Sequence, residues 1–228
     1  MNPTEGKLIL IPTPIGNLED ITYRALRLLR EVDTILAEDT RQTKKLLTHF
    51  EIQNTLESLH QNNEHGKVDS IVKRIQEGHT FGYCTDAGTP GISDPGFLLV
   101  RACLAQHIEV ECLPGATAFV PALVVSGLPC DRFVFEGFLP HKKGRQKKLS
   151  SLKDEVRTIV FYESPHRLIK TLRQIAEFVG SEREVSVSKE LSKLHETHYR
   201  GNVVEVADKL EDIAIKGEFV ICLEGCHD

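Results

Sequence analysis

Hydrophobic and polar positions alternate along the first half of the chain in blocks that predict strands and helices in turn. Short apolar runs predict four strands, at residues 7–12, 34–37, 81–85 and 109–113. Between and after these runs, apolar residues at helical spacing predict four helices, at residues 20–33, 40–50, 68–75 and 98–106. Strands and helices that alternate at this length predict a largely parallel α/β sheet with helices on both faces.

The pattern changes after residues 126–129, where glycine and proline interrupt it in the sequence SGLP. We therefore predict two α/β domains, residues 1–127 and 128–228. Strands are predicted in the second domain at 133–138, 158–162, 184–188, 195–203 and 219–223, and helices at 146–155, 165–179 and 204–215. Because the polar strand at 195–203 follows its predecessor without a helix between them, we expect a mixed sheet in this domain.

Composition and charge limit the classes of function. The chain has 228 residues, is 40% hydrophobic and carries a formal net charge of -5, which excludes a protein that binds nucleic acid over its whole surface. Any contact with RNA is therefore expected to be local. The six cysteines are scattered without a CxxC pair, which predicts reduced thiols and a cytoplasmic location. No apolar run approaches the roughly 18 residues that span a bilayer, so we predict no membrane insertion.

Several common site motifs are absent from the sequence. It contains no GxG, so the glycine-rich turn of dinucleotide folds is missing, and no GxxxxGK[ST] phosphate loop. The spacing around Ser93 does not fit the GxSxG nucleophile turn of hydrolases. No group of cysteines and histidines has the four-ligand spacing of a structural zinc site, and we predict no metal.

Loops rich in glycine and proline follow three of the predicted strands. DAGTPGISDPG occupies residues 86–96, IPTPIGN occupies 11–17, and PGATA occupies 114–118. Glycine allows a close approach of backbone to a ligand, while proline holds a loop in shape. Because the carboxyl ends of parallel strands meet at one edge of a sheet, we expect the three loops to converge there and to line a ligand-binding crevice.

These loops also carry a resemblance to a known family. The chain resembles the ribosomal RNA small-subunit methyltransferase I family, within the tetrapyrrole methylase fold group. The similarity runs from near Lys7 to Gly225 through motifs that occur in order: IPTPIGNLEDIT, AEDTR, DAGTPGISDPG, LPGATA, GLPCDRFVFEGFLP, FYESPHR, KELSK and GEFVICLEG. Many members continue into a helical extension, whereas this sequence ends at Asp228. The resemblance therefore leaves open any role of that extension in binding RNA.

The resemblance implies a function and a set of site residues. It implies S-adenosylmethionine as methyl donor, held in a cleft between the two domains, 2'-O-methylation of a cytidine in the decoding region of small-subunit ribosomal RNA, and a homodimer. Carried over onto this sequence, the cofactor contacts are expected at Pro14, Asp86, Ala87, Gly88, Ile92, Thr117, Ala118, Tyr162, Leu191 and Glu218.

A ribose hydroxyl is a weak acid, so methyl transfer to it benefits from a general base within hydrogen-bond reach. The candidates are Glu163 and His166 in YESPHR and Glu190 in KELSK. Two alternatives stay open at this point. His166 is equally well interpreted as a solvent-facing residue at the start of a helix, and Glu190 as the partner of Lys189 or Lys193 in a salt bridge.

One compact basic segment stands out in this acidic chain. HKKGRQKK, residues 141–148, holds five lysines and arginines and no acid, so phosphate is expected to dock there or on neighbouring cations. The candidate RNA contacts are Arg41, Lys142, Lys143, Arg145, Lys147, Lys148 and Arg167. A solvated loop and helix start would explain the same segment. Asp39 and Arg41 are equally expected to pair with each other or to cap the helix that follows.

Two other functions remain to be distinguished from RNA methylation. A methyltransferase that acts on tetrapyrrole macrocycles would share the fold and the cofactor, but it would need an apolar trough in place of the cationic segment. A non-catalytic RNA-binding or assembly module would bind no adenosyl compound.

Overall fold

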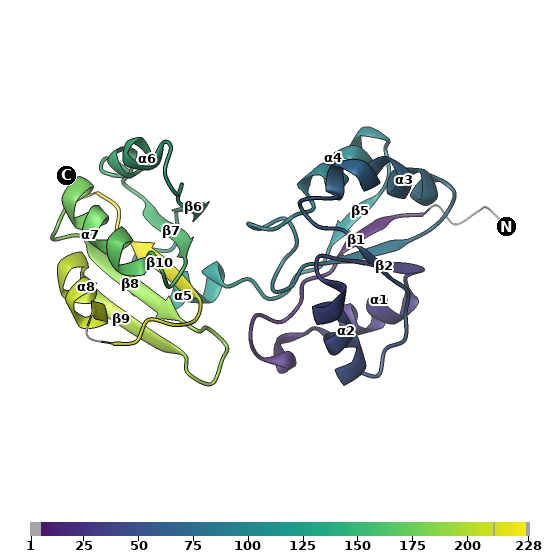
Figure 1. Ribbon diagram of the computed structural model, residues 1–228, viewed down its shortest axis with the longest axis horizontal. Coiled ribbons are helices and arrows are strands. Elements are labelled where there is room, and N and C mark those ends of the chain that lie inside the picture. The colour runs from purple at the N-terminus through teal and green to yellow at the C-terminus, as the bar shows by residue number, and fades with distance from the viewer. Residues whose placement is uncertain (1–5, 212, 227–228) are drawn as a thin grey trace. The chain divides into compact units, whose positions relative to one another are not determined.

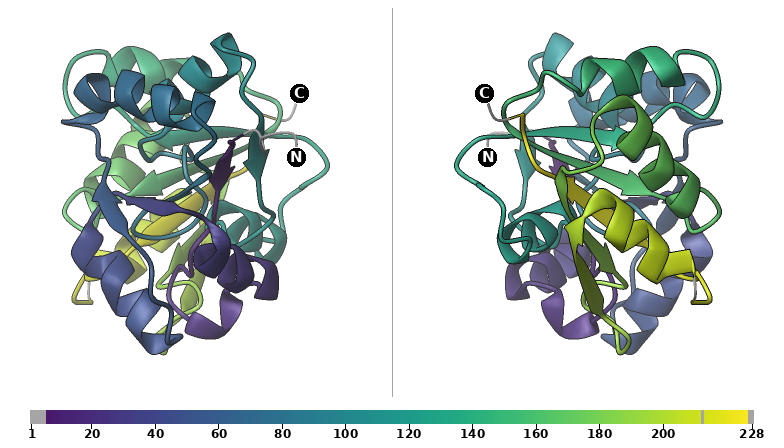
Figure 2. Two further views of the ribbon diagram at one scale, coloured as in Figure 1. Left: turned by 90° about the vertical axis from the view of Figure 1, so that its right-hand side faces the viewer. Right: turned by 90° about the vertical axis from the view of Figure 1, so that its left-hand side faces the viewer.

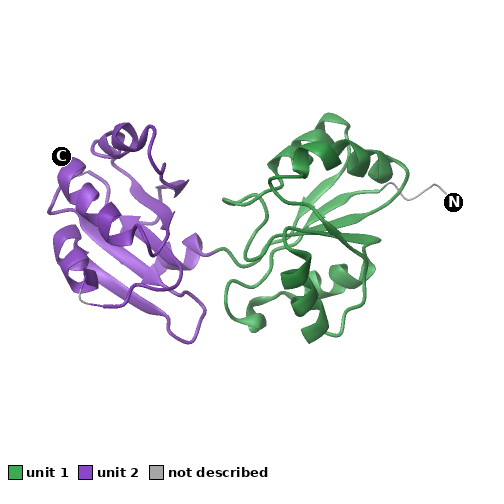
Figure 3. Ribbon diagram, viewed as in Figure 1, with its two compact units in different colours: residues 1–117 green, residues 118–228 purple. Residues whose placement is uncertain are grey.

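The computed structural model describes residues 6–211 and 213–226, and the chain divides into two compact units, Met1–Thr117 and Ala118–Asp228 (Figure 3). The division lies ahead of helix α5 (Phe119–Val125), whereas the sequence pattern placed it after that segment. Helix α5 packs against strands β7 (Thr158–Glu163) and β10 (Phe219–Leu223), both in the second unit. The Gly/Pro interruption at 126–129 is therefore a turn inside the second unit rather than a boundary.

The first unit is built on a parallel sheet with strand order β3-β2-β4-β1-β5. Its strands are β1 (Leu8–Leu10), β2 (Thr34–Ala37), β3 (Leu56–Ser58), β4 (Phe81–Cys84) and β5 (Val110–Cys112). All pairings are parallel, which confirms the predicted sheet. The short edge strand β3 was not predicted, because its sequence, LES, contains a single apolar residue.

Helices cover both faces of this sheet. They are α1 (Tyr23–Glu31), α2 (Thr40–His49), α3 (Glu64–Gln76) and α4 (Phe97–Ala105), and a short 3-10 helix, η1 (Leu18–Asp20), precedes α1. Side chains alternate along a strand, so Leu8 and Leu10 pack in the core under α3 and α4, while Ile9 and Ile11 pack in the core under α1 and α2. Figure 1 shows the two helix pairs on opposite sides of the strands.

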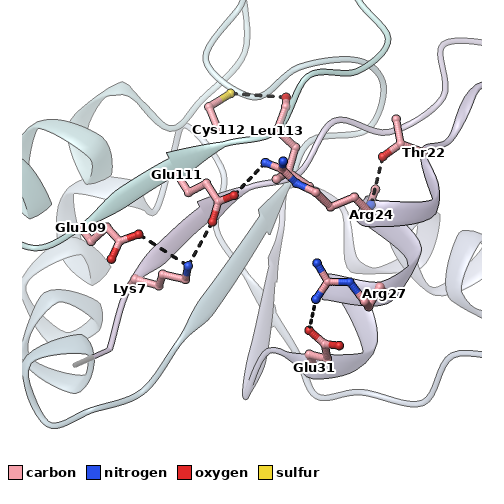
Figure 4. A network of polar contacts seen from close by, with 10 residues as sticks. Lys7, Thr22, Arg24, Arg27, Glu31, Glu109, Glu111, Cys112 and Leu113 are labelled. Carbon is pink, nitrogen blue, oxygen red and sulfur yellow. Dashed lines mark hydrogen bonds and ion pairs between the residues drawn. The ribbon is translucent and has the colours of Figure 1, made fainter. Parts of the chain in front are cut away.

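Ion pairs join the edge strand β5 to the neighbouring elements of the first unit (Figure 4). Lys7 contacts Glu111 at 3.0 Å and Glu109 at 3.6 Å, and Arg24 of α1 contacts Glu111 at 2.7 Å. On the same helix, the hydroxyl of Thr22 accepts a hydrogen bond from the backbone N–H of Ala25 and caps the amino end. These contacts fix α1 and the start of β1 against β5.

The second unit contains a mixed sheet with strand order β6-β7-β10-β8-β9. Strands β6 (Phe133–Phe138) and β7 are parallel, and the pairings that involve β10, β8 (Glu184–Lys189) and β9 (Thr197–Asn202) are antiparallel. The predicted mixed sheet is thereby confirmed. Its helices are α6 (Arg145–Ser151), α7 (Leu168–Phe178) and α8 (Val203–Glu211), which share one core with the sheet. In the right-hand view of Figure 2, α7 and α8 lie in front of these strands.

Helix α5 lies on the other face of this mixed sheet. Ile159 and Phe161 of β7 point into the core beneath α6, α7 and α8, so Tyr162, the residue after Phe161, points the opposite way. The ring of Phe119 on α5 reaches that face through Phe135, which contacts Tyr162. Within the described part of the chain, no helix is long and apolar enough to cross a membrane.

Candidate functional site

The three loops rich in glycine and proline converge at the carboxyl edge of the first sheet, as the sequence predicted. Thr13, after β1, and Gly88, after β4, exchange two backbone hydrogen bonds of 2.9 and 3.0 Å. The hydroxyl of Thr89 lies 3.0 Å from the backbone oxygen of Ala116 and 2.7 Å from the hydroxyl of Thr117, both after β5. Since β4, β1 and β5 are neighbours in the sheet, backbone and hydroxyl groups join all three loops into one surface.

Glycine is required at two positions of the loop at 86–96. Gly88 has φ +82°, and its requirement is conformational, because a Cβ there would make only ordinary contacts with Ile15 and Ala116, at 3.5 and 3.6 Å. Gly96 has φ +122°, and a Cβ there would lie 2.7 Å from the ring of the fully buried Tyr83. L side chains rarely adopt these conformations, so the sequence of this loop is set by its backbone path.

A pocket of about 220 Å³ opens beside the joined loops. Its lining residues come from the first two loops, η1 and α2: Thr13, Pro14, Leu18, Gln42, Thr43, Lys45, Leu46, Thr85 and Asp86. Two predicted cofactor residues, Pro14 and Asp86, are thereby placed in one pocket. Sites for complete small-molecule ligands occupy about 300–1,000 Å³, so this pocket has room for part of a nucleoside-sized ligand.

Asp86 is held in place by the segment that follows β2. Its Oδ1 accepts the backbone N–H of Asp39 at 3.1 Å, and its own N–H donates to the carboxylate of Glu38 at 3.3 Å. Burial raises the pKa of Asp86, and the hydrogen bond from Asp39 offsets part of that effect. The result is a positioned carboxylate that can accept a hydrogen bond from a hydroxyl or amino group of a ligand.

Asp94 is a candidate that sequence reasoning missed. It lines a second pocket, of about 360 Å³, together with Glu38, Ser93 and Phe97. Burial, followed by the negative charge of Glu38, raises the pKa of Asp94 to about 7. The available signal was an acid in a Gly/Pro loop, which by itself does not distinguish a site residue from a turn residue.

The predicted cofactor residues of the second unit lie on two neighbouring segments and one strand. Leu191 is buried between Glu190 and Ser192, which have φ +55° and +64°. The N–H of Glu190 donates to the backbone oxygen of Glu218, and the N–H of Glu218 donates to the carboxylate of Glu190, both at 2.9 Å. Tyr162 is half-buried on β7. The structure therefore brings Leu191 and Glu218 together within this unit.

Comparison with known proteins gives the family. The model of the tetrapyrrole (corrin/porphyrin) methylases matches residues 7–207. A ribosomal RNA small subunit methyltransferase I from Thermotoga maritima is 49% identical over 96% of this chain and 99% of its own length. The relative with that name from Synechocystis is also 49% identical, over 96% of this chain and 79% of its own. The chain belongs to the ribosomal RNA small subunit methyltransferase I family.

Solved structures agree on the fold of this methyltransferase family member. A cobalt precorrin-4 methyltransferase has a TM-score of 0.72 at 18% identity, covering 98% of this chain and 97% of its own. A uroporphyrin-III C-methyltransferase from Thermus thermophilus, complexed with S-adenyl homocysteine, has a TM-score of 0.65 at 17% identity and covers 96% of this chain and 97% of its own. Both similarities show that this chain has the tetrapyrrole methylase fold.

Glu163, the first candidate for the general base, lies inside the second unit, and both oxygens of its carboxylate have partners there. It is 2% exposed, and Arg167 contacts Oε1 at 2.6 Å. The N–H of Ser164 donates to Oε1, and the hydroxyl of Thr171 donates to Oε2, each at 2.7 Å. A carboxylate held by these internal partners stabilises the unit, and we do not retain Glu163 as a base.

The other two base candidates of this methyltransferase I chain differ in environment. His166 is exposed in the turn ahead of α7, which matches the alternative interpretation as a solvent-facing residue. The carboxylate of Glu190 accepts a hydrogen bond from Lys193 at 2.9 Å, so the salt bridge proposed as an alternative is present. Burial raises the pKa of Glu190, but the hydrogen bonds from Lys193 and Glu218 outweigh it and leave the pKa below its usual value.

The basic segment of this methyltransferase I chain is mostly exposed, with Lys142, Lys143 and Lys147 open to solvent. Arg145 is a correction to the predicted RNA contacts. It is 7% exposed, and its guanidinium donates to Gln174, Pro140 and Thr171. It therefore anchors the start of α6 and presents no charge to a phosphate.

The remaining cations of the predicted RNA surface have acidic partners. Lys148 contacts Glu136 at 2.5 Å, and Arg167 contacts the buried Glu163. Arg41 contacts Asp39 at 2.6 Å, and the carboxylate of Asp39 accepts the N–H of Arg41 at the amino end of α2. Pairing and capping, the alternative given for this pair, are thus both present.

Proposed function

We propose that this chain transfers the methyl group of S-adenosylmethionine to the ribose 2'-hydroxyl of a cytidine in the decoding region of small-subunit ribosomal RNA. One observation carries the proposal: in a member of this family, three loops are bonded together at the carboxyl edge of a parallel sheet, where α/β folds bind nucleosides. The names of the relatives support ribosomal RNA as the substrate.

The proposed donor site rests on Pro14, Asp86 and Gly88. Asp86 offers a fixed acceptor in the pocket of about 220 Å³, and Gly88 keeps the joined loops free of side-chain bulk. The other proposed contacts are Ala87, Ile92, Thr117, Ala118, Tyr162, Leu191 and Glu218. When bound, the donor supplies an electrophilic methyl group on a sulfonium. The chain has then to position the ribose oxygen in line with that methyl group.

His166 is the proposed general base. It is the one candidate of the three whose side chain is exposed and, among the described residues, has no charged partner. Glu163 is buried, and the carboxylate of Glu190 is paired with Lys193. A ring nitrogen of histidine can accept the proton of a ribose hydroxyl. The substitution His166→Ala is expected to lower kcat roughly 100-fold or more and to leave the affinity for the methyl donor unchanged.

Incubating the protein with labelled donor and undermethylated small subunits, and mapping ribose methylation by mass spectrometry, tests the proposal. We expect one 2'-O-methylcytidine per subunit with wild type. Asp86→Ala is expected to weaken donor binding roughly tenfold by calorimetry, since it removes a charged hydrogen-bond acceptor. Asp69→Ala, an exposed acid on α3, is the matched control and should leave binding unchanged.

Three outcomes would contradict parts of the proposal. Label on a base rather than a ribose would refute 2'-O-transfer, and methylation of a porphyrin-type macrocycle without labelling of subunits would favour a tetrapyrrole substrate. Absence of donor binding would leave only a non-catalytic RNA-binding module. We also propose that the enzyme is a homodimer, which sedimentation equilibrium measures directly.

A further inference from the structure

Five aromatic rings gather on the face of the second sheet that α6, α7 and α8 leave uncovered. Phe119 of α5 stacks on Phe135 with ring centroids 4.6 Å apart and contacts Phe133 at 5.9 Å. Tyr162 contacts Phe135 at 5.1 Å and Phe138 at 5.5 Å, each edge to face. We call these five residues the aromatic strip. They come from α5, β6 and β7, so the strip exists only in the folded unit.

A β-bulge in β6 brings Phe138 into the aromatic strip. Phe135 lies opposite Val160, and Phe138 lies opposite Tyr162, so β6 advances three residues while β7 advances two. Gly137, with φ +59°, takes up the extra residue. In a regular strand Gly137 would occupy the position beside Tyr162 and would offer no ring. The bulge therefore re-aims a ring toward this face.

The outer rings of the strip are exposed although they are large and apolar. Phe138 is 53% exposed and Phe133 is 38% exposed, and both lie on β6, an edge strand of the sheet. Leaving such rings in water forgoes the stabilisation that burying a large apolar side chain provides. The other three rings are half-buried, so the strip is a set of packed rings with two exposed members, which is typical of a surface that contacts another molecule.

In the sequence, cations precede and follow β6, which carries three of the rings, and they indicate the chemistry of the partner. Arg132 immediately precedes β6 and is exposed, with Asp131 as its neighbour at 3.6 Å. Lys142 and Lys143, four and five residues beyond Phe138, are exposed as well. Aromatic rings between cations suit single-stranded nucleic acid, because bases stack on rings while lysine and arginine contact the phosphates.

We propose that Phe138, supported by Tyr162, stacks against an unpaired base of the RNA substrate while Lys142 and Lys143 contact the adjoining phosphates. The proposal rests on the proposed function, from which it takes RNA as the substrate. It adds a substrate-positioning surface outside the loops of the first unit. In this arrangement the ring selects single strands without selecting sequence, because every base has a face that stacks.

The chain contains no tryptophan, so Phe138→Trp introduces a single spectroscopic probe at the point of stacking. We expect its fluorescence to fall by half or more when a single-stranded RNA 12-mer is added, and much less with the same sequence as a duplex. Val156→Trp is the matched control. Val156 is 67% exposed and precedes β7, at the opposite end of that strand from Tyr162, and its fluorescence should not respond.

Affinity gives a second, independent readout. Phe138→Leu is expected to weaken binding of the single-stranded 12-mer roughly 5- to 150-fold, the range for loss of one base–ring stack, and to raise KM for undermethylated subunits more than it lowers kcat. Phe138→Trp is expected to retain wild-type affinity. Because the ring is exposed, both variants are expected to keep the wild-type melting temperature, which circular dichroism checks.

Each opposite result would overturn the inference. Three results would show that this ring does not stack a base. The fluorescence of Phe138→Trp could stay unquenched while RNA is bound, or it could be quenched by a porphyrin-type macrocycle but not by RNA. Phe138→Leu could also bind RNA with wild-type affinity. If wild type methylates subunits in these cases, the proposed function stands and the stacking surface fails. If wild type labels no subunit, the proposed function fails by that separate measurement.

Discussion

The two units present their candidate residues by different means. In the first, backbone groups of three loops bond to one another, and glycines at positive φ allow the path. In the second, side chains do this work, through the buried carboxylate of Glu163 and the aromatic strip. A site built from backbone depends on which conformations each residue can adopt, whereas a site built from side chains depends on paired charges and packed rings. The two units should therefore fail under different substitutions.

The acids of the two units show the same contrast. Asp86 and Asp94 have raised pKa values because they are partly buried near other acids. Glu163 is more deeply buried but lies against Arg167, with Arg145 at 4.0 Å. Asp94 thus lies near other acids, whereas Glu163 lies against a cation, and we expect a pH dependence of stability at Asp94.

The largest effect on stability is expected at Gly96 of the first unit. Gly96→Ala adds a Cβ 2.7 Å from the ring of Tyr83 at φ +122°, so we expect the free energy of unfolding to fall by about 3–4 kcal/mol. Gly91→Ala is the matched control: φ is +84°, but no atom of the described residues lies within 4 Å of the added Cβ. It should lose about 1 kcal/mol from backbone strain alone. Equal losses in urea unfolding would show that close packing at Tyr83 contributes nothing.

In the second unit the corresponding substitution is Glu163→Gln. It leaves the half-buried Arg167 without its anionic partner, so we expect a loss of about 3 kcal/mol in urea unfolding. The control is Asp208→Asn, which breaks an exposed ion pair with Arg173 and should cost less than about 0.5 kcal/mol. A stable Glu163→Gln protein that has lost methyl transfer would contradict this structural role and would restore Glu163 as a base.

The smallest effect is expected at Asp94, and it depends on pH. Because the pKa of Asp94 is raised to about 7 in the folded state, its ionisation destabilises the fold progressively as the pH rises from about 4 to above 7. Asp94→Asn removes this penalty and should raise the free energy of unfolding at pH 8 by ~1 kcal/mol, after allowance for solvent screening. The gain should shrink as the pH is lowered toward 4. A gain that is constant with pH would show that Asp94 does not titrate in this range.

Strands with continuous apolar runs were predicted well because burial on both faces leaves a strong signal. Thr34–Ala37 and Phe219–Leu223 agree residue for residue with β2 and β10. The missed elements lacked that signal. β3 is polar. Helix α5, with the sequence FVPALVV, contains a proline and follows PGATA directly, so no helix was predicted there.

The candidate site was predictable where the backbone decides it and not where tertiary contacts do. Gly/Pro spacing after three strands was sufficient to predict the joined loops. The burial of Arg145 could not be predicted, because it depends on Thr171 and Gln174 of α7, which are distant in the sequence. Nor does the sequence reveal that Phe138 shares a face with Phe135, because the bulge at Gly137 changes the alternation.

That bulge has a consequence for solubility. The outer side of β6 carries N–H and C=O groups that the sheet does not pair, and such an edge can recruit a strand from another molecule. An irregular edge is a poor template, since an incoming strand cannot match three residues on one side with two on the other. The distortion that turns a phenylalanine toward solvent thus also guards the sheet against aggregation.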